Sequence, residues 1–205
     1  MTDLQTFLDL TMCVCWMATY TLVLISTKTY KYPAISPYVQ AIILPVELGV
    51  SIARITWKSF GFIHFCYLFW SLIEIAIIVE IIRLKFLKNV KLYFTFIIVL
   101  SVAVTYLVVV HDMILFLTYF LTFLGNVIWL VFILSKNDYP FKLLNLIAFF
   151  SKFIGDAVAI PVYLGVGNVI DDIVCIALPS VDFLFIIVYF LKKRQQNNQK
   201  IGLQK

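Results

Sequence analysis

Residues 60–82 read FGFIHFCYLFWSLIEIAIIVEII, and this stretch decides the fold. A helix needs about 20 predominantly apolar residues to cross the hydrocarbon core of a bilayer. The quoted stretch is long enough, and Glu74 and Glu80 are its only acidic residues. We therefore expect Phe60–Ile82 to form a transmembrane helix.

Apolar segments of the same kind fill most of the chain. Of its 205 residues 63% are hydrophobic and 13% charged, whereas soluble domains contain about 25% charged residues. The sequence predicts an all-α integral membrane bundle of seven transmembrane helices, with one domain over residues 1–191 and a polar, basic, disordered tail over residues 192–205. The other six predicted helices are Leu4–Ser26, Pro37–Trp57, Leu92–Val110, Met113–Ser135, Phe141–Leu164 and Asn168–Leu191.

Basic residues predict the orientation of this bundle. All of the 16 lysines and arginines except Arg54, Lys58 and Lys152 fall in or beside the first, third and fifth loops or in the tail. Cytoplasmic loops are enriched in such residues, so we expect the N-terminus outside and the C-terminus in the cytoplasm. The net charge of +5 is then explained by topology, and we expect no nucleic acid partner. The partner of the chain is a lipid bilayer, either the cytoplasmic membrane or the endoplasmic reticulum.

The first apolar segment raises the question of a signal peptide. It follows Thr2 and Asp3 without a basic region before it. A cleaved signal normally begins with positive charge. We therefore expect Leu4–Ser26 to be the first spanning helix.

Several ionisable residues fall inside the predicted helices, where each costs a few kcal/mol by insertion scales and commonly marks function. At 1.5 Å per residue, Glu47, Glu74, Lys152 and Asp182 all lie roughly 12–17 Å from the cytoplasmic side. Desolvation disfavours the charged form of a carboxyl, so we expect protonated acids there. Such groups suit general acid chemistry on an apolar substrate, and they suit a proton-coupled transporter equally well.

Simple pairing explains some of these charges. Glu80 and Arg83 are spaced i,i+3, and Lys152 and Asp156 are spaced i,i+4, so each pair can neutralise itself on one helix face. Glu47, Glu74 and Asp182 have no such local partner, and a functional role is the better interpretation for these three.

Aromatic side chains accompany the acids. Trp70 and Tyr67 share a helix face with Glu74, and aromatic faces stabilise cations. Phenylalanines and tyrosines also crowd the last two predicted helices, where packing explains them. The chain has no aspartate-rich diphosphate motif, P-loop or zinc signature, so we expect neither a metal nor a cofactor.

Four stretches resemble one known family. They are AIILPVELGVSIAR around Glu47, FIHFCYLFWSLIEIAIIVEI with Trp70 and Glu74, FFSKFIGDAV with Lys152 and Asp156, and SVDFLFIIVY with Asp182. Their order over residues 37–190 resembles the integral membrane terpene cyclases of meroterpenoid and indole-diterpene biosynthesis, the pyripyropene- and paxilline-type cyclases. The chain differs from that family at Val46, where a tryptophan is usual, at Glu74 in place of aspartate, and at Lys152 in place of arginine.

The resemblance implies a seven-helix enzyme that cyclises a prenylated, lipophilic small molecule without metal. Glu47 would protonate an epoxide or a terminal alkene, and Asp182 would orient Glu47 or share its proton. Trp70, Glu74, Lys152 and Asp156 would line the substrate pocket. This reading predicts a closed, mostly apolar pocket of roughly several hundred Å3, lined by both Glu47 and Asp182. The alternatives are a small proton-coupled transporter or channel that uses the same carboxylates, and an accessory protein without chemistry of its own.

Overall fold

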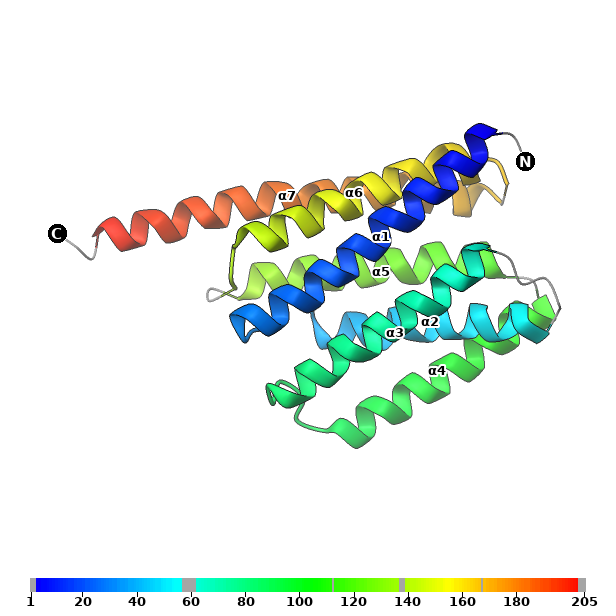
Figure 1. The fold of residues 1–205 in the computed structure, drawn as a ribbon, viewed down its shortest axis with the longest axis horizontal. Coiled ribbons are helices and arrows are strands. Elements are labelled where there is room, and N and C mark those ends of the chain that lie inside the picture. The colour runs from blue at the N-terminus through cyan, green and yellow to red at the C-terminus, as the bar shows by residue number, and fades with distance from the viewer. Residues whose placement is uncertain (1–2, 57–61, 112, 137–138, 167, 203–205) are drawn as a thin grey trace.

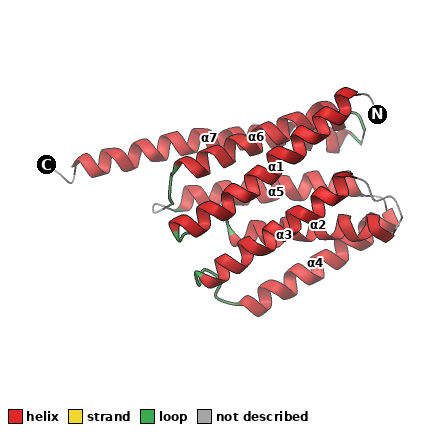
Figure 2. Cartoon of the chain, viewed as in Figure 1, coloured by secondary structure: helices red, strands yellow, loops and turns green. Residues whose placement is uncertain are grey.

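The computed structural model describes residues 3–56, 62–111, 113–136, 139–166 and 168–202, and these form seven α-helices without a strand (Figures 1 and 2). Six of the helices are long and apolar enough to cross a membrane, which identifies a multi-pass, membrane-type helical protein. The remaining helix, α2, is apolar over Pro37–Ala53. The helices are α1 (Asp3–Tyr30), α2 (Pro37–Thr56), α3 (Phe62–Arg83), α4 (Val90–His111), α5 (Ile114–Ser135), α6 (Leu143–Tyr163) and α7 (Val169–Gly202).

All seven apolar segments predicted from the sequence are helices, and most of their ends agree within two residues. The predicted breaks at Lys58-Ser59 and Asp112 lie outside the described residues. The largest error is at the C-terminus, because the predicted disordered tail is helical through Gly202. Propagating an existing helix costs little compared with nucleating one, so α7 continues into its polar end.

Successive helices run in alternating directions, so the two chain ends lie at opposite ends of the bundle (Figure 1). The α1–α2, α3–α4 and α5–α6 loops lie at the same end as the C-terminus. This is the end that carries the basic loops, as the sequence predicts. The assignment of that end to the cytoplasm stays a prediction from the distribution of lysine and arginine.

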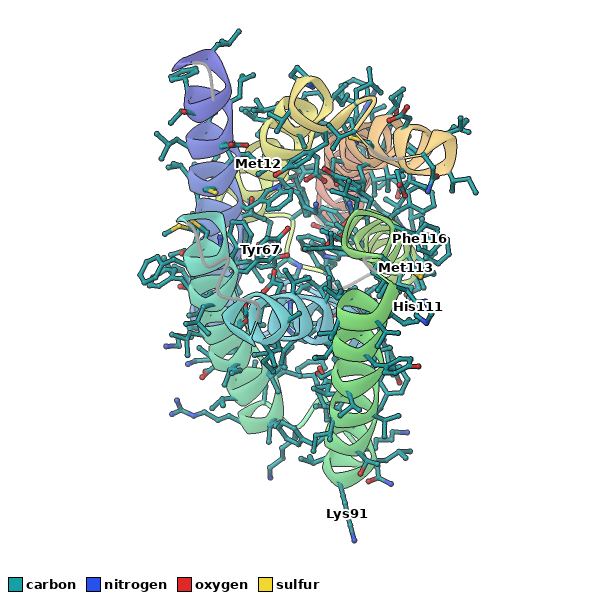
Figure 3. The ribbon with its side chains drawn as sticks, turned by 90° about the vertical axis from the view of Figure 1, so that its right-hand side faces the viewer. Met12, Tyr67, Lys91, His111, Met113 and Phe116 are labelled. Atoms are coloured by element: carbon teal, nitrogen blue, oxygen red, sulfur yellow. The ribbon has the colours of Figure 1, made fainter. Side chains whose placement is uncertain are left out.

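Six helices form a closed ring. In spatial order the contacts run α1, α3, α2, α5, α7, α6 and back to α1. The seventh helix, α4, lies outside the ring against α2, with a smaller contact to α5 (Figure 3). Gly49 permits this close approach, because a Cβ atom there would lie 2.7 Å from Val104 Cγ1 of α4.

The ring divides into two halves, α1–α3 and α5–α7, whose helix contacts correspond, and we call these halves repeats. Exchanging α1 with α5, α2 with α6 and α3 with α7 converts each helix contact of the ring into another: α1–α3 becomes α5–α7, α2–α3 becomes α6–α7, and α1–α6 becomes α2–α5. The exchanged helices also run in the same direction (Figure 1). Helix α4 is the extra element that connects the repeats.

Several buried positions coincide between α2 and α6 and between α3 and α7. Regular spacing alone is common to buried helix faces, but here the polar residues coincide as well: Gln40 corresponds to Asn145, Glu47 to Lys152, Ser51 to Asp156 and Glu74 to Asp182. On α3 and α7 the matching buried residues are Trp70, Ser71, Glu74, Ile77, Ile78 and Ile81, and Leu178, Pro179, Asp182, Phe185, Ile186 and Tyr189.

A Tyr-Pro pair marks the same place in each repeat. Tyr32-Pro33 follows α1 and Tyr139-Pro140 follows α5. The two tyrosine rings meet edge to face with centroids 6.1 Å apart, and the Tyr139 hydroxyl donates a hydrogen bond to the Ala34 carbonyl at 2.8 Å. The loops of the two repeats therefore pack on each other at the basic end of the bundle. The repeat is not evident in the sequence, because the corresponding positions share polarity and burial more than residue identity.

Candidate functional site

Glu47 comes from the centre of α2 and is only 4% exposed. Helix α2 contacts α3, α4 and α5, and this surrounding by protein explains how an acidic side chain is buried there. Pro45, two residues earlier in the helix, has no N–H to donate to the carbonyl of Ala41. The helix is therefore locally weakened next to the acid.

Glu74 of α3 is the acidic neighbour of Glu47, and Tyr20 of α1 interacts with both carboxyl groups. Glu74 is fully buried. Within the described part of the chain, its two carboxyl oxygens and Glu47 Oε2 form no hydrogen bond of normal length and angle. The three groups are thus close enough to interact, but their hydrogen bonds are not fully formed. Two neighbouring carboxyls away from water do not both ionise, so we expect at least one proton on this pair.

A cluster of aromatic rings lies beside the two glutamates. Trp70 contacts Trp16 of α1 and Tyr67 of its own helix edge to face, with ring centroids 5.1 and 4.9 Å apart. Tyr67 lies on the inward side of α3 (Figure 3). The prediction that Tyr67, Trp70 and Glu74 share the inner face of this helix is therefore confirmed.

A second polar cluster belongs to the other repeat. The Lys152 ammonium of α6 lies 2.7 Å from Asp156 Oδ2 and 3.7 Å from Asp182 Oδ2 of α7. Asn126 Nδ2 of α5 donates to Asp182 Oδ1 at 3.0 Å, and Trp16 Nε1 donates to Asp156 Oδ1 at 2.7 Å. One ammonium ion thus serves two buried carboxyl groups that are also hydrogen-bonded.

Gly155 allows Trp16 to reach this second cluster. A Cβ atom at residue 155 would lie 2.5 Å from Trp16 Cδ1, so only glycine leaves room for the indole across α6. Trp16 therefore touches both clusters, through its ring at Trp70 and through its N–H at Asp156.

The two clusters meet at a cavity between the repeats. Its volume is about 20 Å3, and a single water molecule needs about 10–15 Å3. Glu47 and Lys152, the two corresponding residues of α2 and α6, both line it. The full lining is Trp16, Thr19, Tyr20, Ile43, Val46, Glu47, Tyr67, Thr118, Thr122 and Lys152.

This cavity differs from the predicted pocket in size and lining. It is far smaller than several hundred Å3, whereas its wall is mostly apolar, as predicted, with hydroxyl and charged groups among the lining residues. Asp182 is not part of the described lining; it lies behind Lys152. Trp70, Glu74 and Asp156 are also not part of the described lining, and each interacts with a residue that is. The predicted mid-membrane group of Glu47, Glu74, Lys152 and Asp182 is nevertheless gathered around one cavity.

The neighbour of Glu47 also differs from the expectation. The resemblance implied that Asp182 orients Glu47, whereas the structure places Glu74 there. The two local pairs read from the sequence are present, with Arg83 and Glu80 at 3.8 Å and Lys152 and Asp156 at 2.7 Å.

The sequence did not point to several residues of the site, among them Trp16, Tyr20 and Asn126. An asparagine in the middle of an apolar helix was the available signal for Asn126. The two aromatic residues resemble ordinary core residues in the sequence. Among the aromatic residues of α6 and α7, Phe149 and Phe185 are packing residues, since their rings stack on each other and both contact Trp129 in the core.

No group of three or more His, Cys, Asp or Glu side chains suited to a metal ion occurs among the described residues. The polar groups at the cavity are the Glu47 carboxyl, which has Glu74 as its neighbour, the paired Lys152 ammonium and several hydroxyls, and such groups can hold and transfer protons.

Comparison of the chain with protein-family models, with curated proteins and with solved structures finds no match. The geometry and chemistry of this site are therefore the basis for proposing a function.

Proposed function

We propose that the chain is a membrane-embedded cyclase that uses Glu47 to start the cyclisation of a prenyl chain. The observation that carries the proposal is a buried carboxyl that faces a cavity, with a second carboxyl behind it and aromatic rings around it. The resemblance of the four stretches around Glu47, Glu74, Lys152 and Asp182 to membrane terpene cyclases points to the same reaction.

The reaction begins with proton transfer from Glu47. The proton goes to an epoxide oxygen, where a C–O bond breaks and a hydroxyl forms, or to a terminal alkene carbon. Double bonds along the chain then attack the carbocation in turn, each forming a C–C bond. Loss of a proton from the final cation to a carboxylate of the site gives an isomer of the substrate and restores the acid.

The aromatic residues in the cavity wall can stabilise the carbocation as it moves along the prenyl chain. Trp16, Tyr20 and Tyr67 line the cavity, and aromatic faces attract cations by about 0.5–2 kcal/mol. Lys152 would repel a cation, but Asp156 and Asp182 offset its charge.

A prenyl chain needs more room than the resting cavity offers. Pockets for organic ligands measure about 300–1,000 Å3, compared with about 20 Å3 here. Because both repeats contribute walls, separation of the repeats would widen the cavity. The proposal therefore requires the two repeats to move apart when substrate enters.

The repeat itself favours a second candidate, a small proton-coupled transporter. Many transporters consist of two related halves with their binding site near mid-membrane at the interface between them. Glu47 and Lys152 occupy such a place. A proton relay between the two clusters would then couple movement of the halves to proton transfer.

Cyclisation measured in membranes tests the first candidate. Membranes with the wild type, Glu47→Gln or the control Glu80→Gln receive farnesyl- and geranylgeranyl-bearing substrates, with and without terminal epoxides. We expect isomers of unchanged mass and new retention from the wild type and the control. Glu47→Gln should lose 10²–10⁴-fold in rate, as is typical for loss of a general acid.

The control tests whether the loss of rate depends on where the glutamate lies, and not merely on the loss of a buried carboxyl. Glu80 is also a buried glutamate, but it pairs with Arg83 near the end of α3 and is not part of the described cavity lining. An equal loss in both variants would contradict the role of Glu47. Absence of any isomer, together with proton-driven uptake in vesicles, would favour the transporter.

A further inference from the structure

We infer that Glu74 is a positioning residue for Glu47: it stays protonated and donates its O–H to the Glu47 carboxylate as that carboxylate forms. This inference rests on the proposed function of Glu47 as the acid. It gives a specific role to a residue that the resemblance placed only in the wall of the substrate pocket.

Glu74 is a neighbour of Glu47 that is not part of the described cavity lining. Glu47 lines the cavity, while Glu74 is fully buried behind it and interacts with Glu47 and Tyr20. No lysine, arginine or histidine is among the described groups that interact with this pair. A proton is therefore the simplest means to neutralise a carboxyl there.

The other repeat has a corresponding pair of residues, one at the cavity and one buried next to it. Lys152 corresponds to Glu47 and Asp182 corresponds to Glu74. Lys152 lines the cavity, and the fully buried Asp182 supports it from behind at 3.7 Å. Each half of the site therefore has one residue at the cavity and one buried acid behind it. In the second repeat the buried acid forms an ion pair with an ammonium, and in the first repeat the buried acid faces a carboxyl.

Among the described residues, the carboxyl group of Glu74 lacks the hydrogen bonds that a buried polar group normally forms. Both of its oxygens are buried without a regular hydrogen bond to any described group, and such groups in a protein interior call for an explanation. A carboxylic acid has one O–H to donate, and a newly formed carboxylate is a strong acceptor. The hydrogen bond from Glu74 to Glu47 therefore becomes strongest after Glu47 has given up its proton.

Two variants of Glu74 separate this role from packing. Glu74→Gln keeps the shape and an N–H donor, whereas Glu74→Met keeps much of the volume and loses the donor. Removing one donor to a developing anion typically costs 10²–10³-fold in kcat. We expect Glu74→Met to lose that much kcat with little change in KM, and Glu74→Gln to stay within about tenfold of the wild type. Equal rates in the two variants would overturn the inference.

A second measurement tests whether Glu74 is protonated, and it requires no enzymatic turnover. Infrared spectra of the purified protein in lipid report the carbonyl stretch of protonated carboxyl groups. Glu74→Gln should remove one such band, Glu47→Gln should shift the Glu74 band, and Glu80→Gln should leave that band unchanged. If Glu74→Gln removes no band, Glu74 is ionised and the inference fails.

The two measurements distinguish the possible failures. A wild type that converts none of the substrates contradicts the proposed cyclase, while the infrared bands still report on the Glu74–Glu47 pair. Active enzyme with an ionised Glu74 contradicts only the positioning role.

Discussion

Replacing Lys152 by methionine should strongly destabilise the protein. The side chain is 6% exposed, and its ammonium lies 2.7 Å from Asp156 and 3.7 Å from Asp182. Methionine has nearly the same length but no charge. The substitution leaves two buried carboxyl groups without their cation.

The expected cost follows from these contacts. Removing one partner of a buried ion pair costs about 3–5 kcal/mol, because the remaining charge stays buried without compensation. For a domain of 150–250 residues, 1 kcal/mol shifts Tm by about 2–4 °C, which corresponds to a decrease of roughly 6–20 °C here. Lowering the pH should reduce the decrease, since protonation removes the stranded negative charges.

Thermal unfolding of purified protein in one lipid or detergent measures the effect. Lys28→Met is the matched control, because Lys28 is exposed in the last turn of α1, and it should change Tm little. The double variant Lys152→Met/Asp156→Asn should recover part of the loss. If Lys152→Met melts together with Lys28→Met, the buried ion cluster does not hold the helices together.

Two further substitutions test the packing between helices. Gly155→Val places new atoms against Trp16, whose Cδ1 would lie 2.5 Å from the added Cβ; overpacking costs about 1–3 kcal/mol, so Tm should fall, and an unchanged Tm would show that α1 is not held close to α6. Tyr139→Phe removes the hydrogen bond to the Ala34 carbonyl and should cost about 1 kcal/mol, while Tyr38→Phe at an exposed position should cost nothing measurable by the same melting assay.

The long apolar runs made the helices predictable, and helical rise made the depth of their charged residues predictable. A rise of 1.5 Å per residue places Glu47, Glu74, Lys152 and Asp182 at similar depth without any knowledge of packing. The structure confirms this grouping around one cavity. Local pairs such as Lys152–Asp156 were also predictable, because their partners lie on the same helix face.

Neighbours across helices were not predictable from one sequence. The partner of Glu47 depends on the order of helices in the ring, in which α3 and α5 flank α2 while α7 lies beyond α5. Depth is the same for Glu74 and Asp182, so depth could not choose between them. Cavity volume was equally out of reach, because it depends on how side chains such as Trp16 fill the space between helices.

The two repeats place side chains of opposite charge type, Glu47 and Lys152, at corresponding positions of the cavity wall. A site made of two equal halves would place either two carboxyls or two ammonium groups against one small cavity, where like charges repel. Here the corresponding positions carry Glu47 and Lys152, so one wall can give up a proton while the other remains charged and paired with aspartate. The fixed charge of one half and the exchangeable proton of the other are what an acid catalyst and a proton-coupled transporter both require. Isomer formation and vesicle uptake, both measured on the wild type and on Glu47→Gln, therefore decide between the two proposed functions.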